Sequence, residues 1–323
     1  MPFGMGNGFG TPMVRGVEAR DDSGIYLADE LQTMLPKVVE DQYQDLAVTQ
    51  GLIPTTGEAG AGATSFAYKE VTGGGEMVPL DSAGDDYPRV SESGEKKTGV
   101  ILPHGVGFGW DHGELLRAQR LGTPLSDRYA KRARRAYEER RETMAFVGDR
   151  KRNVKGIINN PDVPSVEFQL SGTLLPITSA STAADILSAL LAFTNGMEDD
   201  TADIETAGVL LLPPTPYRHV MQTIMDATNR VTIASEYTRL TGVQIAKSMK
   251  LKNVPAADTG KAAAANFMVL YSVDSEIFEH QIPVPFQIHP VEKAGFRYVV
   301  PCYAEIGDLS MYRPKAVRTA FGF

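Results

Sequence analysis

The strongest helical pattern in the chain is PLSDRYAKRARRAYEERRETMAFV, residues 124–147. At 100° per residue its apolar side chains gather on one face: Leu125, Tyr129, Ala133, Ala136, Tyr137, Met144 and Val147. The opposite face is charged and includes Glu142, while Arg140 interrupts the apolar face and must reach a carboxylate or a solvent edge. Thr123 suits the N-cap, Pro124 the first helical position and Gly148 the end. We therefore expect one long, two-faced helix that lies across a sheet.

The sequence after this helix mixes helical and extended patterns. Four elements are predicted there: a helix at 183–193, a buried strand at 208–212, a helix at 217–227 and a strand at 266–271. Two alternating strands follow. In the first, Ile282, Val284, Phe286 and Ile288 share a face, and in the second the face is shared by Phe296, Tyr298, Val300, Cys302, Ala304 and Ile306. The connection HPVEKAG at 289–295 predicts a hairpin, and the whole pattern predicts an α+β fold.

Residues 51–109 differ in composition from the rest of the chain. Thirteen of these 59 residues are glycine, and large apolar residues are sparse. Short alternating pieces, Ser65–Val71 and Lys97–Leu102, flank a polar middle, which predicts two strands joined by a flexible tip. A two-stranded ribbon is only marginally stable by itself. The segment is therefore either disordered or lies on a neighbouring subunit.

Composition and charge exclude several classes of protein. Hydrophobic residues make up 42% and charged residues 22%, as in an ordinary soluble globular chain. The net charge of -8 argues against a protein built mainly to bind nucleic acid. The single cysteine, Cys302, permits neither an intrachain disulfide nor a thiolate zinc site. Because no signal peptide or membrane-spanning run is recognised, we expect a soluble protein made in the cytoplasm.

One segment has the spacing of a nucleotide-binding loop. In GEAGAGAT, Gly57 to Thr64, the glycines are placed as in a P-loop, but Ala63 stands where the phosphate-binding lysine is required. No buried strand leads into it. A flexible loop is the favoured interpretation, and a nucleotide-binding enzyme that uses Gly57–Thr64 is the less favoured alternative.

Other reactive side chains show no catalytic arrangement. The five histidines form no pair at metal-ligand spacing, and the acidic runs match no calcium-binding loop. Cys302 lies on the inward face of its predicted strand, which indicates a small buried side chain rather than a catalytic thiol. We therefore predict no enzyme activity, no cofactor and no metal.

Positive charge is concentrated on the long helix and just after it. Residues 128–141 hold seven basic side chains against Glu138 and Glu139, and Arg150, Lys151 and Arg152 follow. Such a face is either solvated and paired with acidic neighbours, or it lies near a polyanion.

The order of these features resembles that of a known family. Phe146–Val147–Gly148, followed by Gly156–Ile157–Ile158–Asn159, resembles the junction after the long "spine" helix of tailed-phage major capsid proteins with the Hong Kong 97-type fold. The likeness is greatest to the encapsulin-like branch. Val209–Pro214 resembles a strand of that family's axial domain, and the segment from Ile282 to Ala316 resembles its closing part. The resemblance covers residues 25–323 and depends on the order and spacing of short motifs.

This resemblance implies a division of the chain. Residues 1–48 would form an N-terminal arm and short helix, and residues 49–109 an extended β-hairpin loop. Residues 110–160 and 285–323 would form a peripheral domain that holds the spine helix, and residues 161–284 an axial domain. The extended loop would lie over a neighbouring subunit, with intersubunit contacts through Phe66, Tyr68, Val71, Met77, Val78 and Leu80.

The resemblance also implies a function. Copies of the chain would self-assemble in the host cytoplasm into pentamers and hexamers, and these would close the icosahedral head of a virion around double-stranded DNA. Arg128, Arg132 and Arg135 would form a lumen-facing basic face that contacts packaged DNA without sequence specificity. Portal, scaffold and decoration proteins would be further partners, and no membrane is involved. The main alternative is an encapsulin-type nanocompartment shell, which shares the fold but encloses a cargo enzyme.

Some members of the family join a lysine of the extended loop covalently to an asparagine of the peripheral domain. The loop here offers Lys69, Lys96 and Lys97, but residues 290–323 contain no asparagine. We therefore expect a shell without this cross-link.

Overall fold

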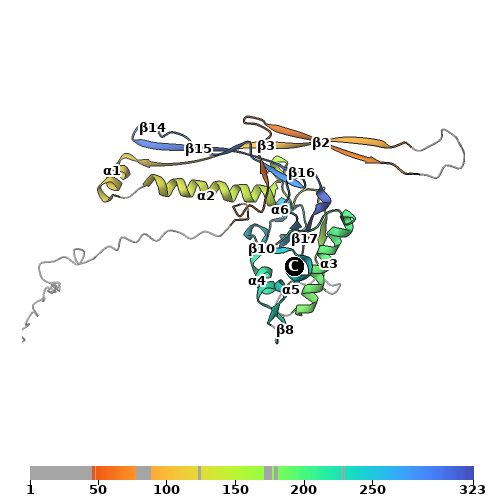
Figure 1. Ribbon diagram of the computed structural model, residues 1–323. Coiled ribbons are helices and arrows are strands. Elements are labelled where there is room, and N and C mark those ends of the chain that lie inside the picture. The colour runs from red at the N-terminus through yellow and green to blue at the C-terminus, as the bar shows by residue number, and fades with distance from the viewer. Residues whose placement is uncertain are drawn as a thin grey trace, which may run out of the picture. The chain divides into compact units, whose positions relative to one another are not determined.

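The computed structural model describes residues 46–47, 49–77, 89–122, 125–170, 177, 181–226, 228 and 230–323. Helices and strands alternate irregularly along these residues, as in an α+β fold (Figure 1). The predicted N-terminal arm and short helix lie outside the described residues except for positions 46 and 47. The predicted N-cap Thr123 and Pro124 lie outside them as well.

A five-stranded sheet separates two clusters of buried side chains. Its strands lie in the order β10 (Gln244–Lys247), β7 (Val209–Leu212), β11 (Phe267–Tyr271), β17 (Val317–Phe321) and β6 (Ser165–Glu167). β11 runs antiparallel to both neighbours, whereas β10 and β6 run parallel to theirs. β17 follows every other described strand in the sequence, yet it lies inside the sheet. The strands predicted at 208–212 and 266–271 are confirmed as β7 and β11.

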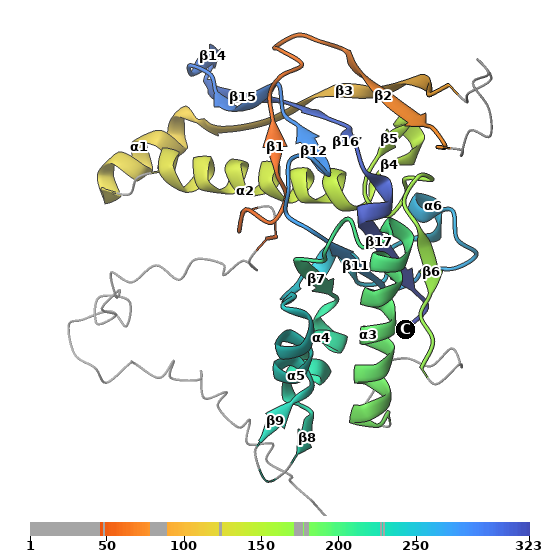
Figure 2. The same cartoon turned by 45° about the vertical axis from the view of Figure 1, so that its right-hand side comes forward.

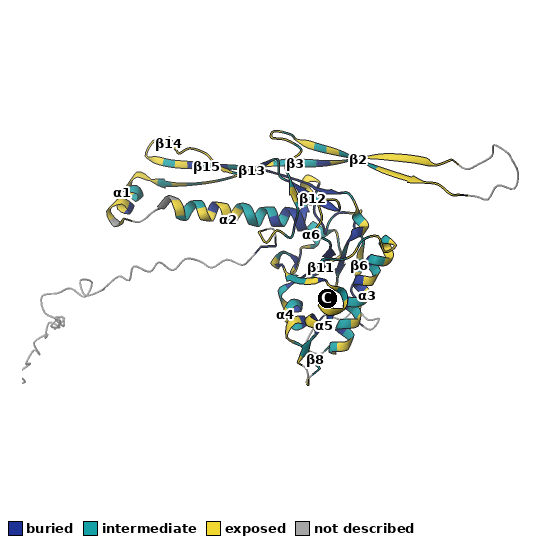
Figure 3. Cartoon of the chain, in the orientation of Figure 1, coloured by how far each residue is buried: buried dark blue, intermediate teal, exposed yellow. Residues whose placement is uncertain are grey.

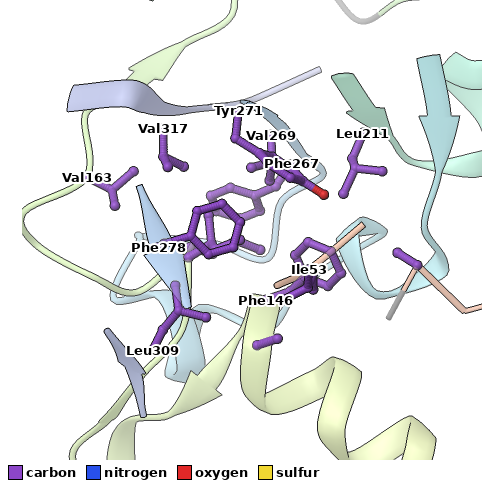
Figure 4. Close-up of a cluster of buried hydrophobic side chains, with 14 of the residues drawn as sticks. Ile53, Phe146, Val163, Leu211, Phe267, Val269, Tyr271, Phe278, Leu309 and Val317 are labelled. Carbon is purple, nitrogen blue, oxygen red and sulfur yellow. The ribbon is translucent and has the colours of Figure 1, made fainter. Parts of the chain in front are cut away.

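Both faces of the sheet are buried at its strands β7 and β11, which explains why these two strands are continuous apolar runs in the sequence. Successive side chains of a strand point to opposite faces, so neighbours in β7 and β11 enter different clusters. One cluster contains Val209, Leu211, Phe267, Val269 and Tyr271, and the other contains Leu210, Leu212, Met268 and Leu270. Figure 4 shows the first cluster, which also receives Ile53, Phe146 and Phe278 from outside the sheet.

Three helices contribute to the second cluster: α3 (Ala183–Thr201), α4 (Pro214–Gln222) and α5 (Ile233–Thr241) (Figure 2). α3 begins where predicted but continues beyond residue 193 to Thr201. The helix predicted at 217–227 is α4, which starts earlier, at Pro214, and ends earlier, at Gln222. It ends there because the hairpin of β8 (Ile224–Asp226) and β9 (Val231–Thr232) follows. No prediction covers α5, although a capping box of Thr232 and Ser235 marks its start.

The second large sheet has the strand order β13 (Val284–Ile288), β15 (Arg297–Gly307), β3 (Ser91–Asp111) and β2 (Ser65–Gly74), and β14 (Glu292–Ala294) also pairs with β15. The predicted closing hairpin is confirmed, since β13 and β15 are antiparallel partners. The predicted two-stranded excursion consists of β2 and the first half of β3, with Ser65 opposite Val100 and Gly74 opposite Ser91. From Ile101 onward, β3 pairs with β15 instead. One strand therefore belongs both to the excursion and to the sheet that carries it.

Two helices follow β3. These are α1 (His112–Leu121) and α2 (Leu125–Phe146), and α2 is the long helix predicted from the sequence. α2 lies along the second sheet (Figure 1). The ring of Tyr129 on α2 stacks on that of Phe108 in β3. Arg140 reaches a carboxylate as predicted, with Nη2 3.1 Å from an oxygen of Asp149.

Two positions on α2 differ from the prediction. Ala136, expected on the buried face, is exposed. Glu142, expected on the charged face, is only 1% exposed. Its carboxylate accepts hydrogen bonds from the Ser248 hydroxyl at 2.9 Å and from the Ala47 backbone N–H at 3.4 Å. Helical periodicity cannot reveal this burial, because both partners lie about a hundred residues away in the sequence.

Two facing glycines shape the end of α2. Gly148 adopts a left-handed φ of 73° and begins β4 (Gly148–Asp149), which pairs with β5 (Val154–Lys155) around the 3₁₀ turn η2 (Arg150–Arg152). A methyl group on Gly156 would lie 2.5 Å from the backbone nitrogen of Gly148, so there is no room for one. Asn159 closes this turn, because its Oδ1 accepts from the Gly156 N–H at 2.6 Å. The junction motif that carries the family resemblance is therefore a tight chain reversal with no room for a side chain at Gly148 or Gly156.

The remaining elements include a small third sheet. It is formed by β1 (Thr55–Thr56), β12 (Phe278–Gln281) and β16 (Leu309–Met311). Short helical elements lie at η3 (Met249–Leu251), α6 (Ala256–Thr259) and η4 (Pro314–Ala316). The segment from β15 through β16 and η4 to β17 runs continuously, so it links all three sheets.

Candidate assembly interface

The ribbon, defined as residues 65–77 and 89–100, comprises β2, the first half of β3 and the described residues that continue them outward. Its outer part is not covered by any other described part of the chain. Val71 is 55% exposed, Met77 98% and Val90 75%. Figure 3 shows this outer part of the ribbon as exposed. Of the six side chains expected at an intersubunit contact, Val71 and Met77 are thus available on the single chain. Val78 and Leu80 lie outside the described residues.

The base of the ribbon is anchored to its own chain. The Tyr68 hydroxyl donates to the Met311 carbonyl at 2.9 Å and accepts from the Met311 N–H at 3.3 Å. Its ring meets that of Tyr312 edge-on, with the centroids 5.2 Å apart. The ring of Phe66 lies over Gly99 on the paired strand. Tyr68 and Phe66 are therefore already half-buried in the single chain, in contrast to Val71 and Met77.

A lysine adds an ionic anchor at the same place. Nζ of Lys97 lies 3.6 Å from an oxygen of Asp162, which belongs to the segment between β5 and β6. It also lies 3.6 Å from Glu95 and 4.0 Å from Glu70, both on the ribbon. The carboxylate of Asp162 raises the pKa of Lys97. The ribbon is therefore tied to the body of the chain by a hydroxyl on one strand and an ammonium on the other.

A buried carboxyl group lies where β3 changes partner. The Asp308 N–H donates to the Val100 carbonyl at 2.8 Å, and its Oδ1 accepts from the N–H groups of Lys155 at 2.7 Å and Leu309 at 2.8 Å. Burial raises the pKa of Asp308 to about 7. Through its backbone N–H and its carboxyl group, Asp308 thus connects the ribbon, β5 and the start of β16.

A second exposed apolar group lies at the opposite end of this sheet. Phe296 is 82% exposed, and Ile288, Val291 and Val299 are exposed as well. The sequence predicts Phe296 on the same face as the buried Cys302, but Phe296 lies in the turn before β15 begins. Apolar side chains thus reach solvent at both ends of the long sheet.

The predicted basic face is only partly available for a polyanion. Nε of Arg135 donates to Glu139 at 2.9 Å, and the Arg135 side chain is only 15% exposed. Arg128 is half-buried and Arg132 is exposed. Arg132 lies one helical turn from both Arg128 and Arg135, at the i,i+4 and i,i+3 spacings of neighbours on a helix surface. The three arginines therefore lie along one side of α2 and differ in exposure.

The P-loop-like segment has the wrong surroundings for a phosphate. It is followed by the strand β2 rather than by a helix, so it lacks the helix N-terminus that a P-loop supplies. The Gly62 N–H donates to a carboxylate oxygen of Glu305 at 3.1 Å. A phosphate at this position would meet a negative side chain. The favoured interpretation as a loop is the one that the geometry supports.

The reactive side chains noted in the sequence lie in structural positions. Cys302 is buried, and burial raises the pKa of its thiol. His280 is fully buried with Nε2 3.2 Å from the Gly307 carbonyl, and burial lowers its pKa to about 3. Among the described residues, no three His, Cys, Asp or Glu side chains gather as metal ligands would. No described helix combines the length and the apolar character needed to cross a membrane.

This fold is shared with solved shell subunits. The capsid of Myoviridae phage XM1 matches with a TM-score of 0.77 and 18% identity, covering 94% of this chain and 100% of that chain. A Mycobacterium phage Ogopogo structure matches with a TM-score of 0.63 and 12% identity, covering 91% and 97%. A virus-like particle from Pyrococcus furiosus matches with a TM-score of 0.53 and 13% identity, covering 85% and 96%. The fold is therefore that of the Hong Kong 97-type capsid subunits.

The family follows from the sequence itself. No curated protein shows significant similarity to the chain. A family model described as "Major capsid protein" matches residues 80–322, and the chain belongs to this family. It is a structural protein of a tailed-phage capsid, located in the virion, and it acts by self-assembly rather than by catalysis. Membership in this family confirms the predicted class and removes the nucleotide-binding enzyme as an alternative.

Proposed function

We propose that copies of this chain assemble as pentamers and hexamers into the icosahedral head of a tailed phage and enclose double-stranded DNA. The observation that carries the proposal is the ribbon, whose outer apolar side chains Val71, Met77 and Val90 are exposed and have no cover from the described residues of their own chain. Each would contribute on the order of 1–2 kcal/mol when a neighbouring subunit buries it. A shell repeats that gain at every contact between subunits.

The proposal assigns a role to each part of the chain. The ribbon, within residues 49–109, is the extended loop that lies on a neighbour. Residues 110–160 and 285–323 form the peripheral domain, residues 161–284 the axial domain and residues 1–48 the N-terminal arm. The sheet that this division gives to the axial domain also contains β17 from the closing segment, so the two proposed domains share a sheet. Portal, scaffold and decoration proteins are proposed as further partners.

The purified chain tests the proposed assembly directly. We expect analytical sedimentation to show rings or closed particles, and negative-stain electron microscopy to show particles of uniform diameter. A stable, well-folded monomer at every protein concentration and salt concentration would contradict the proposal.

We propose further that the face of α2 bearing Arg128, Arg132 and Arg135 points into the lumen, near packaged DNA. Arg132 is exposed and supports this assignment most directly, whereas the Arg135 side chain is only 15% exposed. Phosphate contacts of this kind are sequence-independent and weaken with salt.

Charge reversal on this face gives a testable outcome. The double substitution Arg128→Glu and Arg132→Glu should leave shell assembly intact and reduce DNA retention, with a loss that grows as the salt concentration rises. Arg134→Glu, a charge reversal on another side of the same helix, is the matched control. Genome retention is measured as DNA per particle after incubation at increasing salt. Retention equal to the control at all salt concentrations would leave the face as an intersubunit or solvated surface.

A shell that encloses protein cargo is the second candidate function. The match to the virus-like particle from Pyrococcus furiosus is the observation in its favour, but its TM-score of 0.53 is below the 0.77 of the phage XM1 capsid. Particles purified from the native source decide between the two. DNA inside the particles supports the phage head, and a co-purifying enzyme without DNA supports the cargo shell.

A further inference from the structure

The inner half of β3 has one edge without a partner strand. Hydrogen bonds on β3 alternate between its two edges. The Val100 carbonyl accepts from the Asp308 N–H at 2.8 Å, and the His112 N–H donates to the Phe296 carbonyl at 2.9 Å. The backbone N–H and C=O groups of even-numbered residues therefore point toward β15. The Ile101 N–H donates to the Thr64 carbonyl at 3.0 Å, so the backbone groups of odd-numbered residues point to the other edge of β3, the one on which β2 lies. The pairing of β2 stops at Val100.

Beyond that point the edge of β3 is open. Its backbone groups belong to Gly105, Gly107 and Gly109, and all three residues are exposed. In the described part of the chain no strand pairs with this edge and no hydrogen bond reaches these three N–H groups. Natural proteins shorten, charge or cover such edges, because a free row of N–H and C=O groups recruits another strand. Pro103 lies where the edge begins, and the three glycines after it carry no protecting side chain.

The glycines also leave a gap on one face of the sheet. Gly107 lies opposite Pro301 and Gly109 opposite Val299 on β15, and Val299 is among the exposed apolar residues. Large side chains of an added strand could lie over the glycines and contact Val299 and Pro301, as aromatic side chains do over edge glycines. The edge therefore offers both backbone hydrogen bonds and an apolar surface to an incoming strand.

We propose that the open edge of β3 from Gly105 to Gly109 receives an extended strand of a second copy of this chain. A second copy is the occupant because the family assembles from identical subunits, so each subunit brings the same open edge into a crowded contact. The inference rests on the proposed assembly into shells. It adds a specific contact, main-chain hydrogen bonding between subunits, which is separate from burial of the ribbon's side chains.

Proline substitution tests this contact without changing the pairing with β15. Gly105→Pro and Gly107→Pro together remove two N–H groups that form no hydrogen bond with any described residue of the chain, and proline is tolerated at such a strand edge. Gly105→Ala and Gly107→Ala form the matched control. A methyl group there would lie 3.7 Å from the Cys302 carbonyl and 3.6 Å from the Val300 carbonyl, which are ordinary contacts. Gly109 is left unchanged, because a methyl group would lie 2.5 Å from the Tyr298 carbonyl.

The proline variant should melt like the alanine variant as an unassembled subunit. Its midpoint concentration for shell assembly should be at least about tenfold higher, from the loss of two backbone hydrogen bonds per contact. In the wild-type chain, amide hydrogen exchange in peptides covering residues 103–111 should slow strongly on assembly. The exchange measurement uses only the wild-type chain, so it tests the contact even if the proline variant does not fold.

Two results overturn the inference alone: assembly of the proline variant at the wild-type concentration, or equal exchange of these amides in free and assembled wild-type subunits. Wild-type chains that form no particles under any condition would overturn the proposed shell and the strand contact together.

Discussion

Gly148 and Gly156 approach each other so closely at the end of α2 that a side chain fits at neither position. A methyl group on Gly148 would lie 2.6 Å from the Gly156 nitrogen, and one on Gly156 would lie 2.5 Å from the Gly148 nitrogen. Both contacts are with backbone, which cannot rotate away. Steric exclusion of a side chain therefore explains why the motif that carries the family resemblance has glycine at both positions.

Gly156→Ala should lower the free energy of unfolding by more than about 2 kcal/mol, because the backbone of the junction must shift to admit the methyl group. Gly113→Ala is the control. It lies in α1 with only the flexible Arg117 side chain near the new methyl group, at 3.7 Å, and alanine favours the helix. Urea unfolding of unassembled subunits measures both. Equal stability of the two variants would contradict the steric explanation.

Asp308 predicts a dependence of stability on pH. Its pKa is about 7 in the folded chain and 3.8 as the ordinary value, so the folded state holds the proton more tightly. Its contribution to stability is therefore present in full below about pH 4 and is lost as the pH rises toward 7.

Asp308→Asn keeps an oxygen acceptor for the N–H groups of Lys155 and Leu309 and removes the titration. The stability of the variant relative to wild type should rise between pH 4 and 7, with a slope of at most about 1.4 kcal/mol per pH unit, and level off above. Glu142 and His280 titrate in both proteins, so their effects cancel in the difference. Urea unfolding at several pH values gives the slope, and Asp203→Asn at an exposed site is the control. A slope no greater than that control would contradict the assignment.

At the scale of elements, the ribbon divides into an anchored base and an uncovered outer part. Tyr68 and Lys97 hold the base through Met311 and Asp162. None of the ribbon residues from Gly73 outward belongs to a core cluster of the described chain. We therefore expect folding of the subunit and assembly of the shell to depend on different parts of the same hairpin.

Replacing residues 73–94 with a short Gly-Ser turn should separate these two functions. The shortened chain should still unfold cooperatively, since α2, both large sheets and the anchors at Tyr68 and Lys97 remain, but closed shells should be lost. Thermal unfolding and electron microscopy measure the two outcomes. A control with Val71→Ser and Met77→Ser keeps the backbone and should weaken assembly less. If the shortened chain does not fold, the ribbon belongs to its own core, and if shells form normally, it is a dispensable insertion.

Strong local periodicity made several elements predictable. α2 has a long apolar stripe, β7 and β11 are short continuous apolar runs, and the closing strands alternate. The burial of Glu142 was not predictable in this way, because it depends on Ser248, 106 residues away. The exposure of Val71 and Met77 was predictable, because the composition around them is rich in glycine. The anchor between Tyr68 and Met311 was not predictable, because it joins residues 243 positions apart and leaves no local pattern.

For the whole shell, we expect subunits held together without covalent bonds. Among the loop lysines, Lys97 is engaged with Asp162, and residues 290–323 offer no asparagine to Lys69 or Lys96. Mature particles boiled with reductant should therefore give a single band at the subunit mass on a denaturing gel. A ladder of larger species that survives this treatment would contradict the expectation.

The division into domains is less accessible from the sequence than the elements are. β3 changes partner at residue 100 without any break in its extended pattern, because both partners use the same backbone conformation. β17 begins at Val317, and the strand of its sheet that precedes it most closely in the sequence, β11, ends at Tyr271. Pairing between distant strands is decided by tertiary packing, which single-strand patterns do not record.

The position of β17 has a consequence for synthesis. A chain on the ribosome releases β6, β7, β10 and β11 first, but β6 can join the sheet only through β17, which emerges after all of them. The buried faces of the sheet thus close late in translation. A product truncated before Val317 lacks the strand between β11 and β6, and we expect it to expose parts of both core clusters. We therefore expect that an incomplete chain does not form the fold from which particles are built.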